Sequence, residues 1–238
     1  MFRITLISDT HSKHKQITQD LPGGDILIHA GDISSMGYEH EIREFCKWFN
    51  SLDNYEHKIF IAGNHDWGFQ SNPTKMKEIL DFYSNITYLQ DEALVLYYDG
   101  PNGDFPEDNI RVYGSPWQPR FHNWAFNADP GEDIQQHWNK IPADTDILIT
   151  HGPAFGYLDT VVGRGYDNLG CRDLINKIAE VKPKFHVCGH IHTGYGHKVS
   201  MDGSVNFFNA AVLNEQYVYT QKPITFDWNK ETNEFIFI

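Results

Sequence analysis

Short runs of apolar residues recur along this chain, and polar residues follow each run directly. The runs cover residues 4–7, 26–28, 59–62, 147–149 and 185–187. Uninterrupted apolar runs of this length are typical of strands that are buried on both faces of a sheet. We therefore expect a buried strand at each run, ending at a polar loop.

The segments between these runs carry apolar residues at helical spacing. Residues 39–52 and 170–181 both repeat apolar side chains at intervals of three and four residues. Residues 73–82 form another candidate helix, because Pro73 suits a first helical turn. Strands that alternate with helices predict a layered α/β fold.

The C-terminal part of the chain has the pattern of β-structure without intervening helices. Candidate strands cover residues 205–208, 216–220, 224–226 and 235–238. We expect them to form a second sheet that packs on the first, within a single domain that covers residues 1–238. Residues 99–109 are rich in Gly, Pro, Asp and Asn, which predicts a turn, and residues 115–130 predict a long ordered loop.

Charge narrows the range of partners. The 238 residues carry 32 acidic and 19 basic side chains, for a formal net charge of −13 at pH 7. Nucleic acids and anionic membranes are bound mainly through Lys and Arg, so this balance disfavours both as partners. A small anionic substrate is compatible with it, because bound divalent ions would reverse the local field.

Cysteine usage and hydropathy indicate the cellular compartment of the protein. Cys46, Cys171 and Cys188 form no paired motif, which predicts buried thiols in a reducing compartment. The apolar run at residues 4–7 is too short for the core of a signal peptide, and no segment is long enough to span a membrane. We expect a cytoplasmic protein.

Residue types that bind metals occur in five stretches, each just after a predicted strand. In chain order the stretches are Asp9-x-His11, Gly31-Asp32, Gly63-Asn64-His65-Asp66, His151-Gly152 and Gly189-His190-x-His192. In open α/β sheets, ligands collect beyond the carboxyl ends of strands, so the stretches are expected to converge. Each stretch alone is a weak signal, whereas all of them together predict a metal centre.

The ligand types indicate which ions the centre would bind. Carboxylate, imidazole and amide groups occur without a thiolate, a set that suits Mn²⁺, Fe²⁺ or Zn²⁺ better than Ca²⁺. Two ions about 3.5–4 Å apart would hold a bridging hydroxide for in-line attack and clamp the phosphoryl oxygens of a phosphate ester. The pattern predicts a hydrolase with two divalent ions, and Mn²⁺ is the first expectation.

In this order and strand context, the five stretches resemble the motifs of the calcineurin-like metallophosphoesterases. Longer segments resemble the class III phosphodiesterase branch, which includes the fetal-brain metallophosphodiesterases of vertebrates and bacterial relatives. These segments are residues 7–12, 25–32, 58–65, 114–119, 145–153 and 190–196. The resemblance covers nearly the whole chain and implies a four-layer α/β/β/α sandwich of two mixed sheets flanked by helices.

The resemblance also implies a role for each ligand. Asp9, His11 and His192 would bind the first ion, Asn64, His151 and His190 would bind the second, and Asp32 would bridge the two. His65 would stabilise the transition state or protonate the leaving oxygen, with Asp66 or Asp32 helping it to stay protonated. His65, Asp32 and Asp66 are therefore the candidate catalytic residues.

The branch that the chain resembles suggests small phosphodiesters as substrates, cyclic nucleotides among them. In the loop 115–130, Trp117 and Trp124 could stack a nucleotide base. Arg120 and Arg164 could hold a phosphate or a ribose. The competing interpretations are core packing for the tryptophans and surface solvation for the arginines.

Rival functions stay open at this stage. A phosphomonoesterase or protein phosphatase could use the same ligands, and a non-catalytic scaffold could retain them. A nuclease is disfavoured by the acidic charge.

Overall fold

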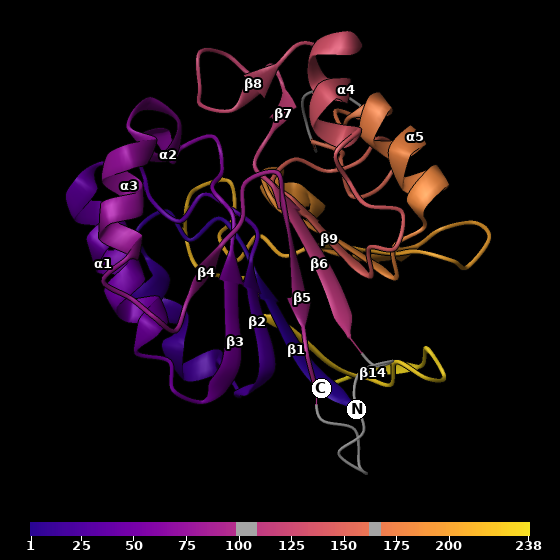
Figure 1. Cartoon of the computed structure of the whole chain (residues 1–238), viewed down its shortest axis with the longest axis horizontal. Coiled ribbons are helices and arrows are strands. Elements are labelled where there is room, and N and C mark those ends of the chain that lie inside the picture. Colours follow the sequence, from indigo (N-terminus) through magenta and orange to yellow (C-terminus); the bar gives the residue numbers. More distant parts are fainter. Residues whose placement is uncertain (99–108, 162–167) are drawn as a thin grey trace.

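Two mixed sheets of six strands lie face to face in the computed structural model, which describes residues 1–98, 109–161 and 168–238 (Figure 1). The strand order is β14-β13-β1-β2-β3-β4 in the first sheet and β11-β12-β10-β9-β6-β5 in the second. The first sheet contains β1 (Phe2–Ile7), β2 (Gly24–His29), β3 (Tyr55–Phe60), β4 (Thr87–Tyr88), β13 (Ile224–Trp228) and β14 (Phe235–Phe237). The second contains β5 (Glu92–Leu96), β6 (Ile110–Ser115), β9 (Ile147–Thr150), β10 (Phe185–Cys188), β11 (Gly196–Val199) and β12 (Asn206–Asn209).

Helices cover the outer face of each sheet, which gives four layers (Figure 1). The first sheet is covered by α1 (Glu39–Asn50), α2 (Trp67–Ser71) and α3 (Pro73–Leu80), and the second by α4 (Glu132–Trp138) and α5 (Arg172–Val181). The connections contain the 3-10 helices η1 (His14–Asp20) and η2 (His192–Gly194) and the paired strands β7 (Gln118–Pro119) and β8 (Asn127–Ala128). The expected α/β/β/α sandwich is confirmed.

Side chains alternate between the two faces of each strand. They form three apolar layers, one between the sheets and one between each sheet and its helices. In β2, Ile26 and Ile28 face the second sheet, whereas Leu27 faces the helices. Ile149 and Phe208 of the second sheet are fully buried in the same layer as Ile26 and Ile28. Burial of such side chains contributes about 1.5–3 kcal/mol each, so the layer between the sheets is a major source of stability. The single domain expected over residues 1–238 stays a prediction, with this shared layer as its basis.

The strands and helices expected from the apolar pattern are present, with shifted ends. Helix α1 ends at Asn50 and α3 at Leu80, each two residues earlier than expected. Beyond α1, the buried Lys58 donates from Nζ to the carbonyl of Leu52 at 2.9 Å. That bond satisfies a carbonyl beyond the helix end, where the chain turns into β3.

The C-terminal strands do not form a sheet of their own, which corrects the expectation. β12 joins the second sheet beside β10, whereas β13 and β14 extend the first sheet beside β1. The reason is that the exposed edge of β1 needs a hydrogen-bonding partner, and β13 supplies an antiparallel one. Residues 216–220 form no strand and contribute only a bridge between Leu213 and Tyr219.

Of the two connections predicted from the sequence, the structure describes one completely and only the last residue of the other. The turn predicted over residues 99–109 lies outside the described residues except for Asn109. The loop 115–130 is described and contains the short parallel pair of β7 and β8. In the described part of the chain, no helix is long and apolar enough to cross a lipid bilayer.

Candidate metal centre

The five motif stretches meet at one end of the two sheets. They follow β1, β2 and β3, which are parallel in the first sheet, and β9 and β10, which are parallel in the second. A hydrogen bond joins the sheets there, because His151 donates from Nδ1 to the carbonyl of Ala30 at 2.9 Å. The predicted convergence is therefore present in the described residues.

The first group of ligand atoms belongs to Asp9, His11 and His192. The Nε2 atoms of His11 and His192 lie 3.4 Å apart. Asp9 Oδ1 lies 3.3 Å from His192 Nε2 and 3.9 Å from His11 Nε2. A point equidistant from these three atoms in their plane is about 2.1 Å from each, which is the length of a metal–nitrogen or metal–oxygen bond. The residues fit a divalent ion.

The second group belongs to Asn64, His151 and Asp32. His151 Nε2 lies 3.0 Å from Asn64 Oδ1 and 3.4 Å from Asp32 Oδ2. The same Asp32 oxygen lies 3.7 Å from His11 Nε2, in the first group. One carboxylate oxygen therefore adjoins both groups, which is the placement that a bridging ligand requires.

His190 and His65 lie at the margin of these groups. Three triads of described Asp and His side chains have ligand atoms within 4.8 Å of one another, and His190 belongs to none of them. Its ring centroid is 5.1 Å from that of His151, and its backbone N–H donates to Asp9 Oδ2 at 2.9 Å. His65 forms a triad with His11 and Asp32. The role of His190 as a ligand stays a prediction.

Backbone carbonyls orient three of the imidazoles. His151, His192 and His65 donate from Nδ1 to the carbonyls of Ala30, Asn214 and Ser35, at 2.9, 2.9 and 2.7 Å. A proton held on Nδ1 by a carbonyl leaves the Nε2 lone pair free. Metal-binding histidines use this arrangement, which fixes the tautomer and the ring orientation.

Several predicted ligands have left-handed backbones. The φ angles are 54° for Asp9, 39° for His11, 55° for Asp32 and 65° for His190. For residues other than glycine this conformation costs about 1–2 kcal/mol each. Such strain persists where surrounding structure imposes it and clusters at functional sites. The loops are held in a geometry that local preference alone would not choose.

Buried charges are paired within the centre. Burial raises the pKa values of Asp9 and Asp32, but their interactions with His192 and His151 bring both below the usual range. Burial alone would lower the pKa of His151. The charge of Asp32 more than offsets this effect and raises the pKa to about 9. Divalent ions would displace the imidazole protons, so metal binding is expected to strengthen as pH rises.

Asp66 faces away from the ligand groups. Its carboxylate accepts from the backbone N–H groups of Gly63 at 2.8 Å, Ile33 at 3.1 Å and Ser34 at 2.9 Å. It ties the loop after β3 to the loop after β2. Burial and the neighbouring charge of Asp32 raise the pKa of Asp66 to about 7. Among the described residues, His65 donates from Nδ1 to a carbonyl and has no hydrogen bond to Asp66.

The residues that were predicted to bind the substrate lie in different parts of the structure. Trp124 stacks on His65 with ring centroids 4.1 Å apart, at the centre. Trp117 instead stacks on His137 at 3.9 Å and packs among core residues, as the competing interpretation expected. Arg120 is exposed and pairs with Asp129 at 2.6 Å. Arg164 lies outside the described residues.

Sequence patterns did not identify three contributors. Tyr217 contacts the rings of His11 and His192 at centroid distances of 4.8 and 5.5 Å. Ser35 and Asn214 contribute backbone carbonyls to the orientation of His65 and His192. The position of a backbone carbonyl cannot be predicted from the types of the side chains. For the loop that carries Tyr217, the turn-forming residue Asn214 was the one sequence feature that indicated a tight turn.

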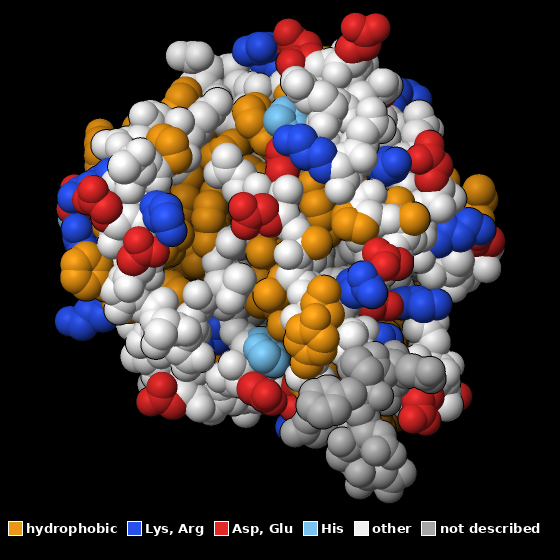
Figure 2. Space-filling view, viewed as in Figure 1, with side chains coloured by type: hydrophobic (Ala, Val, Ile, Leu, Met, Phe, Trp, Pro, Cys, Tyr) orange, Lys and Arg blue, Asp and Glu red, His pale blue; other side chains and the backbone are white. Residues whose placement is uncertain are grey.

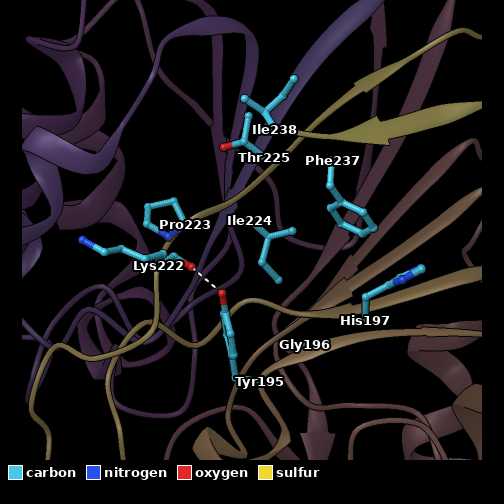
Figure 3. Close-up of a pocket in the computed structure, with 9 residues that line it drawn as sticks. All are labelled: Tyr195, Gly196, His197, Lys222, Pro223, Ile224, Thr225, Phe237 and Ile238. Atoms are coloured by element: carbon cyan, nitrogen blue, oxygen red, sulfur yellow. Dashed lines mark hydrogen bonds between the residues drawn. The ribbon is translucent and has the colours of Figure 1, made fainter.

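A separate cavity of about 330 Å³ opens at residues near β11, β13 and β14 (Figure 3). The hydroxyl of Tyr195 donates to the carbonyl of Lys222 at 2.8 Å on its wall. No predicted ligand lines this cavity, so we do not assign the chemistry to it. Acidic and basic side chains are interspersed on the face viewed in Figure 2.

Comparison with known proteins gives one family and a shared fold. A family model described as calcineurin-like phosphoesterase matches residues 2–194. The human and mouse proteins named metallophosphoesterase domain-containing protein 1 are each 37% identical over 246 residues, covering 94% of this chain and 70% of the relative. The crystal structure of TT1561 from Thermus thermophilus has a TM-score of 0.60 and 11% identity, covering 100% of this chain and 98% of that chain. The last likeness concerns the fold alone.

Proposed function

The chain belongs to the calcineurin-like phosphoesterase family, whose members are metal-dependent hydrolases of phosphate esters, and we propose that it is a phosphodiesterase. The substrates are small phosphodiesters, with cyclic nucleotides among the candidates. Two divalent ions are the proposed cofactors, and Mn²⁺ is preferred over Fe²⁺ and Zn²⁺.

One observation supports a site for two ions more than any other. Asp32 Oδ2 lies 3.7 Å from His11 Nε2 and 3.4 Å from His151 Nε2. These nitrogens belong to separate groups of ligand atoms, so one carboxylate oxygen is within reach of an ion in each. A buried carboxylate in that position is stabilised by two cations and costly without them.

The ligand roles follow from this placement. Asp9, His11 and His192 would hold the first ion, Asn64, His151 and His190 would hold the second, and Asp32 would contact both. When bound, the ions would supply Lewis-acid activation of water and neutralise charge on the phosphoryl oxygens.

His65 is the proposed proton donor to the leaving oxygen. Its Nδ1 is occupied by the carbonyl of Ser35, and its backbone N–H donates to Asp32 Oδ1 at 2.8 Å. These bonds fix the ring and leave Nε2 to carry the transferred proton. Asp66 acts as a positioning residue, since its carboxylate holds the two loops that carry Asp32 and His65.

Local charge favours a diester over a monoester. A diester carries one negative charge, whereas a monoester carries up to two and gains from cationic side chains. In the described part of the chain, no Lys or Arg hydrogen-bonds to or pairs with the side chains of the seven predicted ligands. Among the described residues, the second charge of a monoester would therefore find no Lys or Arg held on these ligand side chains.

Hydrolysis of matched esters tests the proposal. The protein is chelated, reloaded with Mn²⁺, and assayed with bis-p-nitrophenyl phosphate and p-nitrophenyl phosphate, while bound metal is counted. We expect two ions per chain and faster cleavage of the diester. Asn64→Ala should lower the diester rate more than about 100-fold, because it removes a ligand.

Lys77→Ala is the matched control, since Lys77 is exposed on α3 and pairs there with Asp81 at 3.3 Å. We expect it to retain the rate of the unmodified protein. Preference for the monoester would move the protein to the phosphomonoesterase class. Metal binding without turnover of either ester would favour a non-catalytic scaffold, and one ion per chain would contradict the two-ion site.

A reducing, cytoplasmic location is part of the proposal. Cys46, Cys171 and Cys188 are unpaired and buried. Burial raises the pKa of the Cys46 thiol to about 12, which keeps it protonated and unreactive.

A further inference from the structure

Four aromatic rings form a continuous row beside the metal centre. In order, they belong to Trp124, His65, His11 and Tyr217, and this set is called the ring row below. Successive centroids are 4.1, 4.6 and 4.8 Å apart. The two histidines occupy the middle, next to Asp32, and the two larger rings occupy the ends.

The end rings come from loops that are distant in sequence. Trp124 lies between β7 and β8, and its neighbour Ala125 donates from N to the carbonyl of Asn64 at 3.0 Å. Tyr217 lies in the loop after β12. Two unrelated loops thus place a large ring at each end of the row.

The loop of Tyr217 is tightly held although its ring is open to solvent. Asn214 Oδ1 accepts from the backbone N–H groups of Gln216 and Val218 at 3.0 and 2.9 Å. Lys13 Nζ donates to the carbonyl of Tyr217, whose φ is 57°. The Tyr217 side chain is 42% exposed, and its hydroxyl has no hydrogen bond to any described residue. An anchored backbone with an exposed aromatic ring suits ligand contact, because little entropy is lost on binding.

A substrate phosphorus bound at the centre would lie over the middle of the ring row, beside His11 and His65. Its non-bridging oxygens would face the ligand groups, and its two ester substituents would extend outward. One substituent would approach Trp124 and the other Tyr217. A monoester has one substituent and could use one end only.

We propose that Trp124 and Tyr217 bind the two ester substituents of a phosphodiester, one at each end of the ring row, and select for flat substituents. This inference rests on the proposed phosphodiesterase function and adds Tyr217 as a specificity residue. Contact between an aromatic side chain and a flat ligand group is favourable for any base or aryl ring, so the selection concerns shape rather than base identity.

Binding of phosphinates tests this without turnover, because their phosphorus–carbon bonds are not hydrolysed. Diphenylphosphinate offers two flat groups, and dimethylphosphinate offers none on the same anionic centre. Affinities are measured by calorimetry on the Mn²⁺-loaded protein. We expect diphenylphosphinate to bind at least about tenfold more tightly, and Trp124→Ala and Tyr217→Ala each to remove most of that advantage.

The matched variants separate ring contact from structural damage. Tyr217→Phe should retain the preference within about twofold, since it keeps the ring. Phe82→Ala removes an exposed ring, 76% accessible, outside the ring row and should change nothing. Tyr217→Phe and Phe82→Ala should bind dimethylphosphinate and Mn²⁺ like the unmodified protein.

The outcomes distinguish this inference from the proposed function. Equal affinity for the two phosphinates, or equal weakening of both in Tyr217→Ala, would overturn the inference and leave the phosphodiesterase proposal standing. Loss of preference in Tyr217→Phe would replace ring contact by a hydroxyl contact and also overturn it. Failure of the protein to load Mn²⁺ or to bind either phosphinate would overturn both.

Discussion

Two glycines set how closely the loops of the metal centre approach one another. A side chain at Gly63 would collide with the carboxylate of Asp32, and one at Gly189 would collide with the carboxylate of Asp9. Both glycines directly precede predicted ligands in the motifs. Their role in the motifs is therefore close packing against a carboxylate, in addition to any freedom of the backbone.

At the residue scale we predict that Gly189→Ala weakens metal binding. The added methyl group would displace Asp9 from His192, and changes that misplace a ligand typically cost about 10- to 100-fold in affinity. Titration of chelated protein with Mn²⁺ in a calorimeter gives the measurement. Gly152→Ala is the control, because it adjoins His151 but the atom nearest to its added methyl group would be Gln118 Cβ at 3.2 Å, not a predicted ligand. Equal affinity of Gly189→Ala and the unmodified protein would refute the close-packing argument.

At the scale of elements, one half-buried carboxylate anchors the loop that carries Trp124. Asp91, between β4 and β5, accepts from Ser115 Oγ at 2.7 Å and from His137 Nδ1 at 2.8 Å. It also accepts from Lys140 Nζ at 2.8 Å. His137 in turn stacks on Trp117 at 3.9 Å. Strand β6, helix α4 and the loop 115–130 are thereby held by a single side chain.

We predict that Asp91→Asn lowers the free energy of unfolding by about 1–3 kcal/mol, because buried donors lose a charged acceptor. Burial opposes the charge of Asp91, but Lys140 and His137 keep its pKa below the usual value. Its contribution is therefore full above the pKa of the unfolded state and is lost as pH falls through the lower folded pKa. Urea unfolding at pH 7 and at about pH 3, below the pKa of about 3.9 that an Asp has in the unfolded chain, measures both effects.

Asp144→Asn is the control for this change. Asp144 pairs with Arg111 at 2.8 Å, but the two side chains are 59% and 47% exposed. Exposed pairs contribute about 0–1 kcal/mol, so the control should be nearly as stable as the unmodified protein. Similar losses in the two variants would mean that Asp91 is not an anchor.

Across the whole molecule, neutral histidines are buried on the helix side of both sheets. His14 of η1 packs against Trp48 and Phe45, and neither of its ring nitrogens has a partner among the described residues. Burial lowers the pKa of His14 to about 4 and that of His186 in β10 to about 3. Both sides of the sandwich thus resist protonation in the folded state.

The consequence is a loss of stability in acid. A buried histidine with a lowered folded pKa binds fewer protons than the unfolded chain below about pH 6.5, so stability falls as pH decreases from there. For His14 the loss between pH 7 and pH 5 is about 2 kcal/mol. His14→Leu should reduce the measured loss by that amount, in urea unfolding of chelated protein. Parallel pH profiles for the variant and the unmodified protein would contradict this account.

The sequence alone determined the features that depend on local pattern. Apolar runs predicted the buried strands, apolar spacing predicted the helices, and motifs at strand ends predicted that Asp9, Asp32, Asn64 and His151 lie close together. These signals are local because side-chain direction repeats within an element and because parallel strands present their carboxyl ends together.

Tertiary structure decided what depends on contacts between distant segments. It divided the C-terminal strands between two sheets, because β1 needed a partner at its edge, and it packed Trp117 on the core while Trp124 reached His65. It also brought Tyr217 to His11, although the two residues lie near opposite ends of the sequence. Edge pairing and loop packing depend on neighbours that no local pattern specifies, and for that reason they emerge only when the layers are assembled.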